Sequence, residues 1–176
     1  MFHSPMFSGW GSFFALTGSA GAGLVGLLFV VVTLGADLST SRRLDVARAL
    51  LTPALISFTD VLLQGMIVLV PWPSDRPSGI LFLLLGIGGL IYRVNAVRMR
   101  IQRVRLKAID GPIDWTFHNI LPVIGSVSVL AGGAGLIAGA AFAPFAVAGS
   151  TACLLVSGIY RTWSETLVLV APQDKP

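Results

Sequence analysis

Long apolar runs, separated by short polar segments, dominate the hydrophobic pattern of this chain. About twenty consecutive apolar residues cross the hydrocarbon core of a bilayer as a helix. The last apolar stretch, residues 115–159, is too long for one span and must fold back on itself. The pattern therefore predicts an all-α membrane protein, a bundle of about five transmembrane helices that forms one domain over residues 1–176. The predicted spans are residues 12–36, 46–70, 78–94, 115–140 and 144–162.

Turn signals separate these runs. A polar segment, residues 37–45, follows the first run, and three prolines in residues 71–77 forbid a helix after the second. Pro144 suits a first helical position, so residues 141–144 are the predicted turn between the last two spans. The segment after Arg161 could prolong the last helix or lie along the membrane interface, and the pattern does not decide between them.

The start of the chain does not read as a cleaved signal peptide. Residues 1–10 carry no Lys or Arg, and the apolar run that follows is too long for the core of such a peptide. The first run is therefore expected to be a retained helix.

The third span is expected to continue as a basic amphipathic helix to residue 109. Apolar residues recur on one stripe of residues 93–109, and basic residues occupy its other faces. Such a helix would contact anionic lipid headgroups at the membrane surface. The residues expected to make this contact are Arg93, Arg98, Arg100, Arg103 and Lys107.

Composition agrees with a membrane location. Hydrophobic residues make up 55% of the chain and charged residues only 11%, against roughly a quarter charged in soluble domains. A soluble domain would lack the polar residues needed to cover its surface. The surplus of apolar side chains is therefore expected to face lipid.

The distribution of basic residues predicts the orientation. Lys and Arg gather between the first two spans, after the third span and in the C-terminal tail, whereas only Arg76 lies between the second and third spans. Cytoplasmic segments carry this excess, so five spans place the N-terminus outside and the C-terminus in the cytoplasm. Orientation explains the basic run better than nucleic-acid binding, and no nucleic-acid partner is expected.

Asp60 is the most informative single residue, because a charge near the middle of a span is costly without a partner, a proton or water. Ser57, Asp60 and Gln64 recur at three- and four-residue spacing, so they share one face of the second helix. A polar stripe with a central carboxylate suits an ion path or a proton relay. The alternative is that Asp60 is protonated or hydrogen-bonded to a neighbouring helix and fixes packing. Pro53, on the same stripe, could expose a carbonyl to an ion or simply kink the helix.

Asp114 and His118 stand four residues apart at the start of the fourth span and are expected to form a hydrogen-bonded interfacial pair. The local sequence offers no further metal ligands and no nucleophile beside them. No phosphate loop, metalloprotease pattern or hydrolase motif occurs in the sequence. We therefore expect neither an enzyme nor a bound metal or cofactor.

Small residues in the first span predict close helix packing. Gly18, Ala22 and Gly26 follow one another at four-residue spacing, and small residues let helix backbones approach in a membrane. The same span, from Phe13 to Val30 with its alternating Gly and Ala, resembles small bacterial membrane proteins of unknown function. This resemblance implies a bacterial inner membrane and no particular activity.

Two functions remain open at this point. The polar stripe of the second helix favours a homo-oligomeric channel or ion-conducting unit, with its path between subunits, because five helices enclose little volume. Short loops and little soluble mass instead favour a non-catalytic accessory subunit that packs on and stabilises a larger membrane complex.

Overall fold

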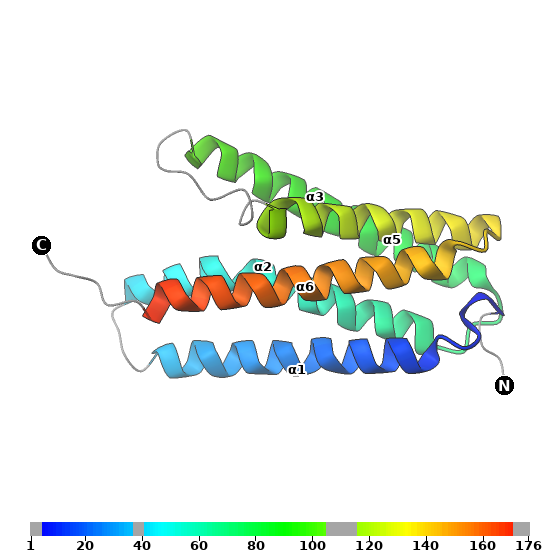
Figure 1. Ribbon diagram of the computed structural model, residues 1–176, viewed down its shortest axis with the longest axis horizontal. Coiled ribbons are helices and arrows are strands. Elements are labelled where there is room, and N and C mark those ends of the chain that lie inside the picture. The colour runs from blue at the N-terminus through cyan, green and yellow to red at the C-terminus, as the bar shows by residue number, and fades with distance from the viewer. Residues whose placement is uncertain (1–4, 37–40, 105–115, 171–176) are drawn as a thin grey trace, which may run out of the picture.

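The computed structural model describes residues 5–36, 41–104 and 116–170. This part of the chain contains helices and no strands, and five of its helices are long and apolar enough to cross a membrane (Figure 1). The prediction of an all-α bundle of five membrane helices is confirmed. The long helices are α1 (Gly11–Ala36), α2 (Ser41–Leu69), α3 (Asp75–Val104), α5 (Leu121–Ala138) and α6 (Ala143–Val170). A short 3₁₀ helix, Pro5–Phe7, precedes α1, and a π-helix, Thr116–Ile120, leads into α5.

Several helix ends differ from the predicted spans. α3 begins at Asp75, inside the segment 71–77 that the three prolines were predicted to keep free of helix, because Pro77 is tolerated in the first turn of a helix. α2 begins at Ser41, within the segment predicted as a polar connection. α3 continues to Val104, as the amphipathic pattern predicts, and residues 105–109 lie outside the described residues. α6 extends to Val170, so residues 162–170 prolong the last helix, and residues 171–176 lie outside the described residues.

The helices pack side by side in the order α1, α2, α6, α5, α3, and α3 also touches α2. α1 packs almost entirely on α2, so it forms one edge of the bundle (Figure 1). α1 begins and α6 ends at opposite ends of the bundle, as an odd number of spans requires (Figure 1). We call the end where α1 begins the aromatic end, and the end where α6 finishes the basic end.

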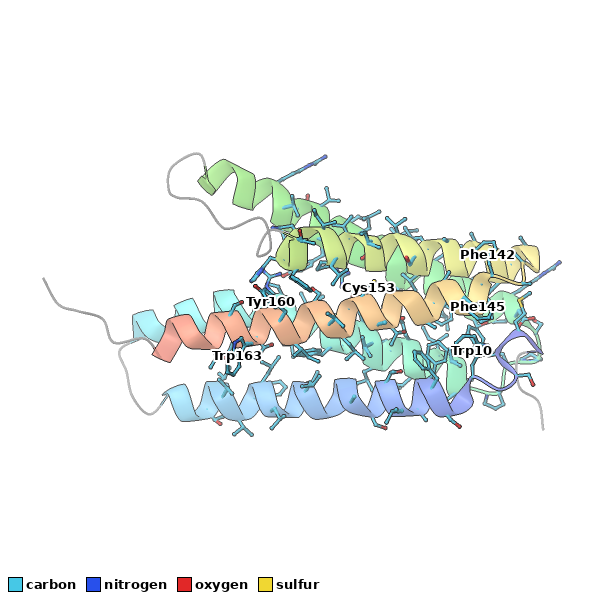
Figure 2. The ribbon with its side chains drawn as sticks, in the orientation of Figure 1. Trp10, Phe142, Phe145, Cys153, Tyr160 and Trp163 are labelled. Atoms are coloured by element: carbon cyan, nitrogen blue, oxygen red, sulfur yellow. The ribbon has the colours of Figure 1, made fainter. Side chains whose placement is uncertain are left out.

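Aromatic side chains lie toward both ends of the bundle. Trp10, Phe142 and Phe145 gather at the aromatic end, whereas Tyr160 and Trp163 lie toward the basic end (Figure 2). The rings of Trp10 and Phe145 meet edge to face, with their centroids 4.9 Å apart. Amphipathic aromatic rings prefer the two membrane–water interfaces, so this placement agrees with a bundle that spans the bilayer.

A cluster of apolar side chains, which we call the apolar plug, fills the interior at the aromatic end. Phe7 packs edge to face on Phe14 at a centroid distance of 5.6 Å, and it also approaches Phe82. The plug joins residues from the 3₁₀ helix and from all five long helices. Its buried members are Phe7, Phe14, Val68, Phe82, Val129, Leu136, Ala143 and Val147.

Glycines bring α1 and α2 into close contact. A Cβ added to Gly21 would lie 2.9 Å from the carbonyl oxygen of Phe58, and one added to Gly65 would lie 2.9 Å from that of Phe14. Small residues allow this approach in lipid. Within this chain only one member of the predicted stripe packs on another helix: Gly18 faces α2, whereas Ala22 and Gly26 are exposed. A 3.6-residue period rotates a strict four-residue stripe away from a straight contact line.

Gly139 reverses the chain between α5 and α6. Its φ of 73° lies in the left-handed region, which residues with a Cβ rarely adopt. The N–H of Ala140 donates to the carbonyl of Gly135 at 2.8 Å, which closes the end of α5. Pro144 then stands in the first turn of α6. The predicted turn at residues 141–144 therefore lies slightly too late in the sequence, since the reversal begins at Gly139.

Candidate functional site

Asp60 of α2 and Arg93 of α3 form a salt bridge inside the bundle. The Nη2 group of Arg93 donates to Oδ2 of Asp60 at 2.6 Å. Only 9% of Asp60 and 6% of Arg93 is exposed, and both residues lie within segments able to span a membrane. A lone charge at this depth costs several kcal/mol. The salt bridge makes the pair neutral and so lowers that penalty.

Ser126 of α5 extends the pair to a third helix. The Nη1 group of Arg93 donates to Oγ of Ser126 at 2.8 Å, and Ser126 donates to the carbonyl of Pro122 at 3.2 Å. Gly89 provides the space for this contact, because a Cβ there would collide with Nη1 of Arg93 and lie 3.3 Å from Oγ of Ser126. One turn of α3 therefore supplies both the guanidinium group and the room that it occupies.

Gln64 makes a second polar contact one helical turn beyond Asp60. Its Nε2 group donates to Oγ of Ser150 at 3.3 Å, and its Oε1 atom accepts from Oγ1 of Thr151 at 2.7 Å. All three side chains are fully buried. Both ends of the Gln64 amide are thus satisfied by α6, as a buried polar group requires.

Ser57 lies one turn before Asp60 and completes the stripe. Its Oγ donates to the carbonyl of Pro53 at 3.1 Å, and α2 continues as a helix through Pro53. We call Ser57, Asp60 and Gln64, with Arg93, Ser126, Ser150 and Thr151, the polar series. Its α2 members are all buried, and Asp60 and Gln64 bind α3 and α6 of the same chain. An ion path along this stripe would therefore run inside one chain and not between subunits.

The structure corrects the interpretation of Arg93 as a lipid contact. Its guanidinium group is buried on Asp60 and Ser126 and does not reach the bundle surface. The basic amphipathic pattern wrongly includes Arg93 as its first basic residue. Arg93 instead turns inward, because it is the arginine of α3 that pairs with the buried carboxylate of Asp60. Arg98 is exposed, as that pattern predicts. The side chains of Arg100 and Arg103 are not among those described, and Lys107 lies outside the described residues.

The polar series is closed by apolar side chains at one end and opens into a cavity at the other. Toward the aromatic end, Val68 follows Gln64 by one turn and belongs to the apolar plug. Toward the basic end, the series opens into a cavity of about 40 Å³. The polar side chains that line this cavity are Ser57, Tyr92, Arg93, His118, Asn119 and Arg161.

His118 is held by α6 at the edge of this cavity. Its Nε2 atom lies 3.3 Å from Oγ of Ser164, and its carbonyl accepts from Nη1 of Arg161 at 3.4 Å. The neighbouring Phe117 ring stacks on Tyr160 with centroids 4.4 Å apart. The predicted partner of His118, Asp114, lies outside the described residues, so that pairing stays a prediction.

No group of three or more His, Cys, Asp or Glu residues that could hold a metal ion occurs within residues 5–36, 41–104 and 116–170. No protein-family model, curated protein or solved structure matches the chain.

Asp60 and Gln64 can be predicted from the sequence as interior polar residues, but their partners cannot. Arg93 follows an apolar run and starts a basic one, so its sequence context resembles a helix end. The requirement for charge neutrality at Asp60 is the one signal that could have identified it. Ser126, Ser150 and Thr151 stand in small, weakly polar surroundings, where hydroxyl groups carry no distinctive pattern.

Proposed function

We propose that this chain is a non-catalytic subunit of a bacterial inner membrane, which packs on and stabilises a larger membrane complex. The Asp60–Arg93 salt bridge carries the proposal, because it neutralises both intramembrane charges within the chain's own bundle. A second subunit is then not needed to satisfy them, and the outer faces of the helices are available for contacts. The apolar plug supports the same proposal, since it closes the polar series at one end.

The outer surface of α1 is suited to contacts with other helices as well as with lipid. Large apolar side chains project from it, with Leu16 71%, Leu27 62% and Phe29 59% exposed. A helix that packs on a single neighbour within its own chain leaves most of its surface for external contacts. This asymmetry agrees with a subunit that sits beside other membrane proteins.

The orientation belongs to the proposal. We place the start of α1 outside the cell and the end of α6 in the cytoplasm. The support is that the arginine-rich start of α2, Arg98 of α3 and Arg161 of α6 all belong to the basic end of the bundle. Cytoplasmic ends of membrane helices carry such an excess.

Purification from the native membrane in a mild detergent tests the subunit function. We expect the native mass of the purified species to include a foreign membrane protein at fixed stoichiometry. Exchange into a harsher detergent should release this partner and leave the five-helix chain folded. A single species that contains only copies of this chain would contradict the proposal.

A second function is favoured by the cavity beside Arg93. A homo-oligomeric ion-conducting unit could use the polar series of each chain as its path, entered from this cavity. The fixed guanidinium charge would repel a metal cation, so proton or anion movement fits the interior better. Conduction would require the apolar plug to open.

Flux into liposomes separates the second function from the first. Conduction predicts ion or proton flux above that of empty liposomes, with loss of that flux in Asp60→Asn. Asp75→Asn is the matched control. Asp75 lies at the start of α3, where its Oδ1 atom accepts from the N–H of Met6. Wild-type liposomes without flux would reject conduction even if the Asp60 variant failed to fold.

A further inference from the structure

Glycine brings α1 close to α2 in the middle of the bundle but not toward the basic end. A Cβ added to Gly21 would lie 2.9 Å from a backbone oxygen of α2, whereas one added to Gly26 would meet nothing within 4 Å. Nearer the basic end the two helices meet through large side chains, since Leu28 and Leu51 belong to one buried cluster. Helices that meet through leucines stand farther apart than helices that meet through glycines.

A groove of about 270 Å³ lies between these parts of α1 and α2. The end of α1 and the start of α2 are both at the basic end of the bundle (Figure 1). Leu28 and Leu51 are buried, whereas Phe29 is 59% exposed, so the groove runs from the interior to the outer surface. All but one of the residues that line it are apolar. They are Leu28, Phe29, Val32, Leu51, Thr52 and Leu55.

The size and the lining of the groove suit a single hydrocarbon chain. Its residues belong to the segments Gly11–Thr33 and Leu51–Leu69, which are able to span a membrane. A dry apolar cavity of about 150 Å³ takes up benzene, so about 270 Å³ accommodates a stretch of an acyl chain. A transmembrane helix is roughly 10 Å across and could insert only single side chains.

The start of α2 supplies positive charge beside the groove. Arg48 precedes Leu51 by three residues and Leu55 by seven, so helical register places the three on one face of α2. At 1.5 Å per residue, Arg48 stands about 4.5 Å from Leu51 along the helix axis, toward the basic end. Residues 37–48 hold three arginines and two aspartates. This excess does not depend on how single side chains pair, and basic segments next to membrane helices attract anionic lipid headgroups.

We propose that this groove binds one acyl chain of an anionic phospholipid, with the phosphate headgroup at the start of α2. The groove and the basic segment follow each other along α2 in the order of a lipid's own parts, with the chain in the hydrocarbon core and the headgroup at the interface. A neutral lipid would gain the apolar contact alone. The site is separate from the proposed subunit function and does not depend on it.

Native mass spectrometry of the delipidated full chain in a mild detergent tests the lipid class. Phosphatidylglycerol and phosphatidylcholine with identical acyl chains would each be titrated, and the fraction of protein that carries one lipid would be measured. We expect phosphatidylglycerol to bind at least about fivefold more tightly, which is the contribution of one arginine near a membrane surface. Equal affinities would overturn the proposal, because lipids that coat the bundle without a specific site give that result.

Two matched pairs of variants locate the site. Val32→Phe fills the groove and should abolish the preferred binding of phosphatidylglycerol, whereas Val30→Phe makes the same change at an exposed position of α1 outside the groove and should not. Arg48→Gln should weaken phosphatidylglycerol about fivefold and leave phosphatidylcholine unchanged. Arg98→Gln removes the same charge from an exposed position on α3 and should change neither.

Equal effects of the two changes within either pair would overturn the assignment. The same spectra report the mass of the protein without added lipid. A wild-type dimer that Val32→Phe converts to a monomer would show that a second copy of the chain occupies the groove, and this result would also overturn the proposal.

Discussion

At the scale of single residues, the interior of the bundle depends on where each polar atom finds its partner. Asp60, Arg93 and Gln64 are buried in segments able to span a membrane, and each meets a partner on a neighbouring helix. Burial of these groups is tolerated because the hydrogen bonds and the salt bridge are formed within the chain. Their removal one at a time should therefore destabilise the bundle more than loss of an exposed polar group.

Gly89 and Gly88 provide a matched test of the space around Arg93. A Cβ at Gly89 collides with the guanidinium group, whereas a Cβ at Gly88 meets nothing within 4 Å. We expect Gly89→Ala to lower the free energy of unfolding by about 1–3 kcal/mol through overpacking. Gly88→Ala should be neutral or stabilising by up to about 1 kcal/mol. Thermal unfolding in detergent compares the two, and equal unfolding temperatures would contradict the position of Arg93.

Gln64 offers a second test at this scale. In Gln64→Leu the hydroxyl groups of Ser150 and Thr151 lose their side-chain partner, although Thr151 keeps its bond to the Val147 carbonyl at 3.0 Å. A buried polar group left without a partner costs about 1–3 kcal/mol. We expect Gln64→Leu to lower the free energy of unfolding by that amount. The double variant Gln64→Leu, Ser150→Ala should lose less than the sum of the two single variants. A double variant as unstable as the sum of the single variants would show that these residues do not interact.

The sequence predicted Asp60 and the face that it shares with Ser57 and Gln64, because helical spacing alone fixes which residues share a side. It did not predict Arg93 as the partner of Asp60. That pairing depends on how α2 and α3 are placed against each other, and helical periodicity within one segment does not determine this. For the same reason Ser126, Ser150 and Thr151 could not be predicted as partners. Their hydroxyl groups reach Arg93 and Gln64 only once the helices have packed.

At the scale of helices, close contact depends on which glycines face a neighbour. The number and type of the helices follow from the lengths of the apolar runs, and these were predicted correctly. The face of α1 that packs on α2 could not be predicted, because small residues occur all around this helix. Gly21 faces α2, whereas Gly23 faces away and meets nothing within 4 Å.

Gly21 and Gly23 therefore form a matched pair two residues apart. A Cβ at Gly21 would lie 2.9 Å from a backbone oxygen of α2, so Gly21→Ala should push the two helices apart. We expect it to destabilise the chain by about 1–3 kcal/mol, and Gly23→Ala to leave its stability unchanged. Unfolding by a denaturing detergent would measure both variants. Equal effects would show that α1 packs on α2 through a different face.

At the scale of the whole molecule, five spans place the start of α1 and the end of α6 on opposite sides of the membrane. The basic end should face the cytoplasm. A reporter that is active only outside the cytoplasm should be active when fused before α1 and inactive when fused after α6. A reporter that is active only in the cytoplasm should give the opposite result. The same activity at both ends would contradict five spans, and a full exchange of sides would contradict the orientation alone.

The central claim is that Asp60 and Arg93 neutralise each other inside one chain, and a double-mutant cycle tests it most directly. Asp60→Asn and Arg93→Gln would be made separately and together, and the free energy of unfolding of the monomer measured in detergent. Each single change leaves one uncompensated buried charge and should cost about 3–5 kcal/mol. The double variant removes both charges, so it should be more stable than either single variant. Single losses that simply add in the double variant would contradict the account, since they would show that the two side chains do not interact.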